Sequence, residues 1–286
     1  RRILGPWSGP RIGAVGKRGA VGKRGAVGKR GAINEHSKVE LGVAVKGLLV
    51  IPAYNEAANI GGTILCLRDA EVREEILVVN DGSNDGTAQI LEGLGVLQIT
   101  HEKNKGYLGA LRTGMNYARA KDYDYVVFFD ADGQHDAGDL VRFRDKLRAS
   151  GGPDIVTGSR FVPGPGIRRP VYRAPVGRKA GMVLFSHLTG WLSGQRIYDT
   201  TCGFKALTRR ALDLVYDKEF GDFHAEMLIF CIIAGLRVEE IPVVVHERVA
   251  GDSMYDLAAS LKYPFRTMRA IAKLYPAARR HKSVLR

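Results

Sequence analysis

The sequence has few cysteines and no long hydrophobic run. Its 286 residues include three cysteines, Cys66, Cys202 and Cys231. Their wide spacing matches neither a disulfide framework nor a metal-ligand motif, so we expect a reducing compartment. The longest uninterrupted apolar run covers residues 227–236, about half of what a membrane-spanning helix needs. No secretory signal is visible either, which favours a cytoplasmic location.

Acidic residues are scarce at both ends of the chain. Residues 1–38 contain ten Lys and Arg against one acid, and residues 262–286 contain eight and no acid. The segment between them has 25 basic and 29 acidic residues, although the whole chain carries a net charge of +13. A basic total usually indicates nucleic acid or anionic lipid as a partner. Here this indication applies to the ends and not to the centre.

The N-terminal segment contains a short repeat. VGKRGA occurs at 15–20, 21–26 and 27–32. A six-residue period is too short for a helical solenoid, and Gly, Lys and Arg dominate, so we predict a flexible basic arm over residues 1–40. Two interpretations stay open: an arm that binds anionic lipid or nucleic acid, and a solvated tail without a specific function.

From residue 41 the pattern predicts an α/β fold. Apolar strand-like runs alternate with helical segments, and this order is typical of a largely parallel sheet flanked by helices. We expect a catalytic domain over residues 41–255. The predicted strands are 43–51, 75–79, 96–100, 125–129, 155–157 and 238–245. The predicted helices end near 69 and 91 and cover 108–120, 177–192 and 222–235.

Three predicted strands end in polar, turn-rich sequence: PAYNE, NDGSNDGT and DADGQH. In α/β sheets ligands bind outside the carboxyl ends of the strands, so we expect a site where these ends converge. Asp130 and Asp132 follow the buried strand 125–129 directly, and paired carboxylates suit Mg²⁺ or Mn²⁺. The alternative is a turn that is acidic only because turns favour Asp and Gly.

Two further segments bear on the site. Residues 158–175 are rich in proline and glycine and form a long predicted loop, a common place for a functional lid. Residues 256–286 are predicted as a basic amphipathic helix and tail, with Met268 and Ile271 on the apolar side and Arg269 and Lys273 opposite. Such a helix lies on an anionic membrane surface, or packs on the domain with a solvated basic face.

Taken together, the motifs resemble those of the family 2 glycosyltransferases, which have the Rossmann-like GT-A fold, and most of all the polyprenyl-phosphate (dolichyl-phosphate) sugar synthases. The resemblance extends from about Leu48 to Ser253. Its motifs, in order, are VIPAYNE, VVNDGSNDGT, NKGYLGALRTGM, FFDADGQH, GSRF, DTTCGFKAL and RVAGDS. Seven motifs in the family's order are far more specific than any one alone.

The resemblance implies roles for individual residues. Glu56 would reach the ribose and Asp81 the base, whereas Asn80 stands where many relatives have an acid. The implied nucleotide-sugar-binding residues are Pro52, Tyr54, Glu56, Asp81, Asn104, Gly109, Asp130 and Ala131. The implied metal ligands are Asp130, Asp132 and Gln134, and the implied catalytic residues are Asp132, Arg248, Arg160, Asp222 and Glu226.

The implied activity is metal-dependent, inverting transfer of a sugar from a GDP-, UDP- or dTDP-linked donor. The acceptor would be a polyprenyl phosphate or another lipid-linked group, and the enzyme would be peripheral on the cytoplasmic face of the membrane. A phosphate acceptor is already ionised and needs cations, for which Arg160, Arg178 and Arg248 are candidates.

Two alternatives stay open. A hydroxyl acceptor needs a base, and the i to i+4 spacing would place Asp222 and Glu226 on one helix face. The other alternative is a basic nucleic-acid-binding protein. The slightly acidic centre and the lack of a nucleic-acid motif argue against it.

Overall fold

The computed structural model describes residues 45–163, 176–246 and 257–284. Within α6 and α9, side chains are described for residues 181–193 and 266–282. The predicted N-terminal arm, most of the proline-rich loop and the RVAGDS motif lie outside the described residues.

The described residues form a seven-stranded sheet in the order β3-β2-β1-β4-β6-β5-β7. The strands are β1 (Gly47–Ala53), β2 (Glu75–Asn80), β3 (Leu97–Thr100), β4 (Tyr125–Phe128), β5 (Ile155–Ser159), β6 (Lys205–Thr208) and β7 (Val238–Pro242). β1 pairs in parallel with both β2 and β4, so the ends of these three strands are neighbours at one edge. The predicted α/β fold with a mostly parallel sheet is confirmed.

β6 was not predicted. It is the antiparallel strand of the sheet and lies between β4 and β5. Its four residues, KALT, are too few to show a periodicity, and the helix-forming run RRAL follows at once. β7 is also shorter than predicted: it ends at Pro242, and Val245 forms an isolated bridge with His135 instead.

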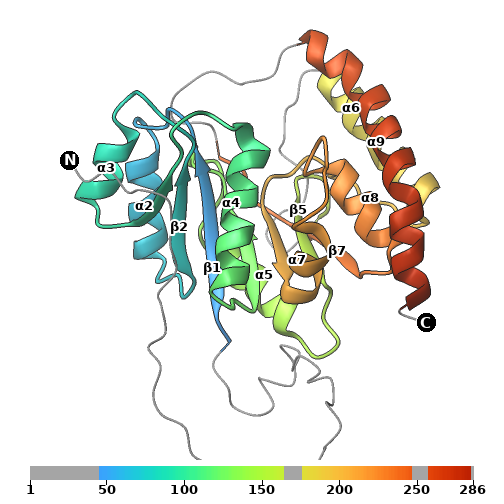
Figure 1. Ribbon diagram of the computed structural model, residues 1–286, viewed down its shortest axis with the longest axis horizontal. Helices are drawn as coiled ribbons and strands as arrows, with labels where there is room; N and C mark the ends of the chain where they lie inside the picture. Colours follow the sequence, from blue (N-terminus) through green and yellow to red (C-terminus); the bar gives the residue numbers. More distant parts are fainter. Residues whose placement is uncertain (1–44, 164–175, 247–256, 285–286) are drawn as a thin grey trace, which may run out of the picture. The chain divides into compact units, whose positions relative to one another are not determined.

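Helices cover both faces of the sheet (Figure 1). They are α2 (Ile60–Asp69), α3 (Thr87–Gly93), α4 (Gly106–Ala120), α5 (Asp139–Arg148), α6 (Val176–Ser193), α7 (Arg209–Val215), α8 (Ala225–Ile233) and α9 (Leu257–Val284). Alternate residues of β1 point to opposite faces. Leu48 and Val50 join the core with α4, α7 and α8, and Leu49 and Ile51 join the core with α2 and α5.

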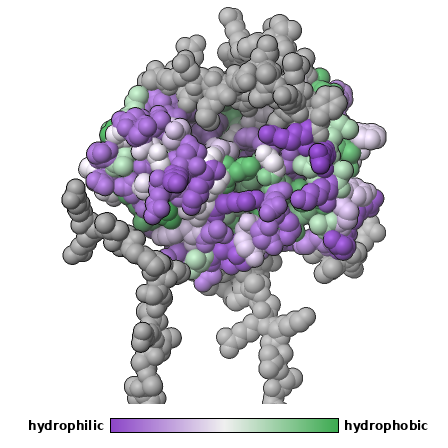
Figure 2. Space-filling view, turned by 45° about the horizontal axis from the view of Figure 1, so that its top comes forward, coloured by the Kyte–Doolittle hydropathy of each residue, from purple (hydrophilic) through white to green (hydrophobic). Residues whose placement is uncertain are grey.

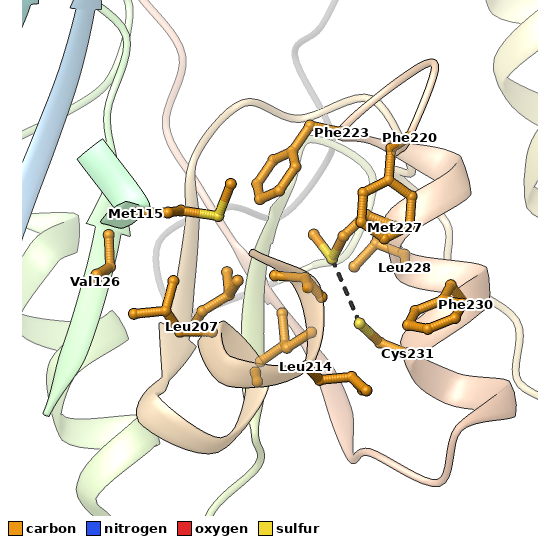
Figure 3. Close-up of a cluster of buried hydrophobic side chains, with 14 of the residues drawn as sticks. Met115, Val126, Leu207, Leu214, Phe220, Phe223, Met227, Leu228, Phe230 and Cys231 are labelled. Carbon is orange, nitrogen blue, oxygen red and sulfur yellow. Dashed lines mark hydrogen bonds between the residues drawn. The ribbon is translucent and has the colours of Figure 1, made fainter. Parts of the chain in front are cut away.

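The apolar run 227–236 is a buried core segment. Every residue of α8 is buried, and Figure 3 shows Met227 and Leu228 among side chains from α4, β4, β6 and α7. α9 packs on α8 through Ile271, Leu274 and Ala278. Of the two interpretations of the C-terminal helix, the packed one describes Ile271, whereas Met268, predicted on the same apolar side, is 49% exposed. No helix in the described ranges combines the length and the apolar character needed to span a bilayer.

Candidate active site

The loops after β1 and β2 are joined by hydrogen bonds into one platform. The Asn55 amide donates to Ser83 Oγ (2.9 Å), and the Asn84 amide donates to Asn55 Oδ1 (3.0 Å). The Ala57 amide donates to Asp85 Oδ2 (2.9 Å). Asn55 has a φ of 54°, in the left-handed region that asparagine tolerates better than most residues. Two loops that are far apart in sequence thus form one surface.

The platform contains Pro52, Tyr54 and Glu56. Pro52 lies in β1, Tyr54 follows the strand with its ring exposed, and the Glu56 amide donates to Thr87 Oγ1 (3.0 Å). One Glu56 carboxylate oxygen accepts a hydrogen bond from Asn59 Nδ2 (2.7 Å). These contacts hold the glutamate at the edge of the sheet where β1 ends.

Asp81 is buried and held from two sides. Its Oδ1 lies 2.6 Å from His101 Nδ1 and accepts a hydrogen bond from the Lys105 amide (2.8 Å). His101 Nε2 lies 2.8 Å from Thr113 Oγ1 on α4. The carboxylate is therefore fixed by a network and is not a simple helix cap.

The loop before α4 packs on the turn that follows Asp81. A Cβ on Gly82 would lie 3.0 Å from the backbone nitrogen of Asn104, and its φ of 74° favours glycine. Asn104 Oδ1 accepts a hydrogen bond from the Gly106 amide (2.8 Å). Gly109 lies one turn into α4 and lines a cleft of about 420 Å³ with Lys105 and Phe220.

Asp130 lies directly after β4 and its environment favours the ionised form. His135 Nε2 is 3.1 Å from Asp130 Oδ2, and the carboxylate lies against the Cα of Gly203. Burial alone would raise the pKa of Asp130, but the His135 hydrogen bond and the nearby Lys205 bring the pKa below its ordinary value. An ionised carboxylate is the form that binds a cation.

The other two predicted metal ligands lie in the same loop. Asp132 Oδ1 accepts a hydrogen bond from the Gln134 amide (3.1 Å). Gln134 Nε2 donates to the carbonyl of His246 (3.2 Å), which leaves the amide oxygen of Gln134 as the atom suited to a cation. Ala131 lies between the two aspartates, and its carbonyl accepts a hydrogen bond from Thr63 Oγ1 on α2 (2.9 Å).

These donors fit a hard divalent cation. Two carboxylates and one amide oxygen match the preference of Mg²⁺ and Mn²⁺, and the remaining positions would be left for water and phosphate. Within residues 45–163, 176–246 and 257–284 no group of three His, Cys, Asp or Glu side chains is suited to a metal.

Arg160 is engaged by a buried carboxylate. Its Nε and one Nη donate to Asp199 (2.7 and 2.8 Å), and the same Nη donates to Thr201 Oγ1 (2.7 Å). Burial alone would raise the pKa of Asp199, but Arg160 holds it below its ordinary value. Arg248 and the side chain of Arg178 lie outside the described residues. The described segment before Arg248 ends at His246, whose backbone amide donates a hydrogen bond to the Gln134 carbonyl (2.8 Å).

The expectation that Asp222 and Glu226 share a helix face is wrong. α8 begins at Ala225, so Asp222 lies before the helix and accepts a hydrogen bond from the Ala225 amide (3.1 Å). Glu226 is fully buried, and its Oε2 accepts hydrogen bonds from the amides of Gly221 and Asp222 (2.7 and 3.2 Å). Burial raises the pKa of Glu226. Helix periodicity cannot apply across a helix start, and Glu226 closes the loop from inside.

Several residues that hold the site were missed from the sequence. They are His101, which fixes Asp81, Asp85, which joins the platform loops, and Gly203 and Lys205, which lie beside Asp130. The sequence marks these positions, because His101 directly follows a predicted strand and Gly203 and Lys205 belong to the motif DTTCGFKAL. Their partners are 20 or more positions away, and spacing alone does not reveal such pairs.

Figure 2 shows the molecule turned so that the top of Figure 1 comes forward. Hydrophilic residues cover most of the coloured surface in this view, on both sides of a narrower hydrophobic area. A charged, water-soluble ligand fits such a surface.

The sequence matches known proteins over most of the described region. Residues 48–214, more than half of the chain, match the family model of glycosyl transferase family 2. A polyprenol monophosphomannose synthase of Mycolicibacterium smegmatis is 32% identical over 72% of this chain and 79% of its own length. An undecaprenyl-phosphate mannosyltransferase of Micrococcus luteus is 32% identical over 72% of this chain and 86% of its own length.

Solved structures agree on the fold. A glucosyl-3-phosphoglycerate synthase of Mycobacterium tuberculosis, in complex with Mn²⁺ and uridine-diphosphate-glucose, superposes with a TM-score of 0.59. The alignment covers 83% of this chain and 82% of that chain at 20% identity. The predicted GT-A fold and the predicted family are both confirmed. The motifs, their geometry and the matched residues together show that the chain is a glycosyltransferase and belongs to glycosyl transferase family 2.

Proposed function

We propose that the protein transfers a sugar from a nucleoside diphosphate to a polyprenyl phosphate, with inversion and with the help of a divalent cation. The observation that carries the proposal is the arrangement of three strand ends at one edge. Glu56 and Asp81 are held on the platform of β1 and β2, and Asp130 and Asp132 follow β4, which is the next strand. The names of the relatives support the choice of acceptor.

The residues divide the work between donor and metal. Glu56 would accept hydrogen bonds from the ribose and Asp81 from the base. Asp130, Asp132 and Gln134 would hold a divalent cation, which would neutralise charge on the departing nucleoside diphosphate. Pro52, Tyr54, Asn104, Gly109 and Ala131 would line the donor site through backbone and ring contacts.

A phosphate acceptor agrees with what surrounds the site. Such a group is ionised at neutral pH and needs no strong base. Glu226 is fully buried and one of its carboxylate oxygens accepts from two backbone amides, which disfavours it as a base for a hydroxyl acceptor and leaves Asp222 as the better candidate of the two. Arg248, two residues beyond His246, would supply positive charge for the acceptor phosphate. Because Arg160 is paired with Asp199, it would act on the acceptor only through the electrostatic field of this ion pair.

The lipid acceptor would be met at a membrane surface. α6 exposes Val183, Leu184 and Trp191, the last with 79% of its surface in solvent. α9, which contacts α6, exposes Arg266, Arg269 and Lys273. Apolar and aromatic side chains beside basic ones suit an anionic bilayer. We infer peripheral binding to the cytoplasmic face.

The test is a transfer assay with purified protein. It combines a polyprenyl phosphate with GDP-, UDP- and dTDP-sugars and Mg²⁺ or Mn²⁺, and mass spectrometry detects the glycosylated lipid. We expect one donor class to react and Asp132→Ala to abolish transfer, whereas Asp145→Asn, an exposed change on α5, leaves the rate unchanged. Transfer that persists in Asp132→Ala or in excess chelator would refute the metal-dependent mechanism.

The acceptor class has its own test. Asp222→Asn is compared with the unsubstituted protein on a lipid phosphate and on a lipid-linked hydroxyl acceptor. A phosphate acceptor predicts only a moderate loss of transfer. Two results together would establish the alternative of a base-requiring acceptor. Asp222→Asn would lose nearly all transfer, and the unsubstituted protein would transfer faster to the hydroxyl acceptor than to the lipid phosphate.

A further inference from the structure

A buried lysine lies beside the DADGQ loop. Lys205 is the first residue of β6, where it pairs with Phe128 of β4 and Thr157 of β5. Only 1% of its surface is exposed. Lysine is almost never buried to this extent without partners, so its contacts should reveal what it does.

One contact leads toward the metal side of the site. Lys205 Nζ donates a hydrogen bond to the carbonyl of Cys202. The next residue, Gly203, is the one whose Cα lies against the Asp130 carboxylate. The lysine therefore closes the turn on which Asp130 rests.

The other contact leads toward the acceptor side. Lys205 Nζ lies 3.3 Å from His224 Nδ1, and the His224 ring stacks on Tyr107 with 5.7 Å between centroids. A lysine nitrogen carries protons in either charge state, so this contact suits an accepting Nδ1 with the ring proton on Nε2. His224 Nε2 lies 3.9 Å from Asp222 Oδ1. The lysine thus determines which ring nitrogen faces the aspartate with a proton.

The surrounding charges favour this arrangement. Burial lowers the pKa of Lys205, and the carboxylates of Asp222, Asp199 and Asp130 oppose this effect. Burial also lowers the pKa of His224, and Lys205 lowers it further, whereas Asp222, Asp130 and Asp199 raise it. A neutral histidine accepts from the lysine at Nδ1 and turns its Nε2–H toward Asp222, whose Oδ1 at 3.9 Å is beyond direct hydrogen-bond distance.

We propose that Lys205 is a positioning residue that connects the two halves of the site: it closes the turn that supports Asp130 and fixes His224 as the Nε2–H tautomer that faces Asp222. Lys205 is too deeply buried to touch a substrate. It acts through the groups it contacts, the turn after Cys202 and the His224 ring. The inference rests on the proposed function only in that Asp222 belongs to the acceptor side.

The first experiment needs no substitution. Long-range ¹H–¹⁵N NMR of the imidazole nitrogens reports the tautomer and charge of His224, assigned by comparison with His224→Gln. We expect a neutral ring with Nε2–H at neutral pH in the unsubstituted protein. In Lys205→Met we expect the Nε2–H tautomer to lose its dominance, because Nδ1 then has no donor from Lys205. A ring protonated on Nδ1, or an imidazolium, in the unsubstituted protein would overturn the proposal.

The second experiment measures transfer. Lys205→Met is expected to lower kcat by roughly 10–100-fold, the range typical of outer-shell partners, and to leave KM for the nucleotide sugar nearly unchanged. Combining it with His224→Gln should cost no more than the worse single change, because the two act as a unit. Lys273→Met, an exposed lysine on α9, is the control for lost charge.

The outcomes separate the two hypotheses. Equal kcat in Lys205→Met and Lys273→Met would contradict the positioning role. So would a loss of kcat in the Lys205→Met/His224→Gln double variant that equals the product of the two single losses. If Lys205→Met does not fold, the NMR result on the unsubstituted protein decides alone. If that protein transfers no sugar, the proposed function fails, and the tautomer measurement still tests the link from Lys205 to His224.

Discussion

At Gly203, the absence of a side chain leaves space for the carboxylate of Asp130. A Cβ built there would be 2.3 Å from Asp130 Oδ2, inside the contact distance of any real side chain. The carboxylate contacts His135 and lies against the turn of residues 202–205, and 31% of the Asp130 side chain is exposed. Glycine is thus required here by close approach, although its φ is not in the left-handed region.

We therefore predict that Gly203→Ala displaces Asp130. A shift of about 1 Å in a positioned group can cost roughly 100-fold in rate, so we expect a loss of this order in transfer, measured by product formation at saturating substrate. Gly62→Ala is the control, since no atom lies within 4 Å of its Cβ position on α2. Equal rates in the two folded variants would show that Asp130 is not held by the turn.

The buried pair of Arg160 and Asp199 predicts a pH dependence of stability. The folded-state pKa of Asp199 is lowered, so its unfolded form takes up a proton first as pH falls. The contribution of this ion pair to the free energy of unfolding is complete well above the ordinary aspartate pKa of about 3.9. It is lost as pH falls through the lowered folded-state pKa of Asp199.

Asp199→Asn should accordingly lower the free energy of unfolding most at neutral pH. Removing one partner of a buried ion pair typically costs about 3–5 kcal/mol, and we expect the difference from the unsubstituted protein to shrink at about pH 3. Urea unfolding at both pH values measures it. Asp217→Asn, in an exposed pair with Lys218, should change little at either pH. A difference that is independent of pH would show that Asp199 does not titrate as stated.

At the scale of elements, short loops are made rigid by each other. The β1 and β2 loops exchange hydrogen bonds through Asn55 and Asp85. Both lie in motifs that the sequence singles out, so the existence of this platform was predictable. Its internal contacts were not, because turn chemistry indicates where a loop bends and not which loop it meets.

α6 and α9 give a prediction about membranes. Trp191→Ser combined with Val183→Ser should weaken binding to vesicles of anionic phospholipid, because both changes remove exposed apolar surface from α6. Leu65→Ser on α2 is the control, because Leu65 is about as exposed as Val183 (51% and 49%). Vesicle co-sedimentation at low and high salt measures the effect. Binding that is lost equally in both proteins, or in neither, would exclude α6 as the docking element.

At the scale of the whole molecule, charge and catalysis are separated along the chain. Residues 1–38 carry ten of the 43 basic residues, whereas the described site residues lie between Pro52 and Glu226. Residues 34–286 form a compact unit by themselves. Catalysis should therefore not depend on the N-terminal segment.

We predict that a chain lacking residues 1–38 keeps kcat and KM for the nucleotide sugar. The measurement is the transfer assay, paired with a nucleic-acid binding assay at low salt, where basic segments bind most strongly. Loss of transfer on truncation would assign the segment to the enzyme. High-affinity nucleic-acid binding that vanishes on truncation, in a protein with no transferase activity, would favour the nucleic-acid-binding alternative.

The sequence by itself determined the fold class, the family, and the acidic residues at the strand ends, because these depend on local patterns such as strand runs, turns and the motif order. Only the tertiary structure decided which groups hold those residues. It placed Arg160 on Asp199, separated Asp222 from the face of Glu226, and inserted the antiparallel β6 that brings Lys205 next to Asp130. The physical reason is that buried charges must find partners, and a folded chain supplies them from distant segments that no spacing rule connects.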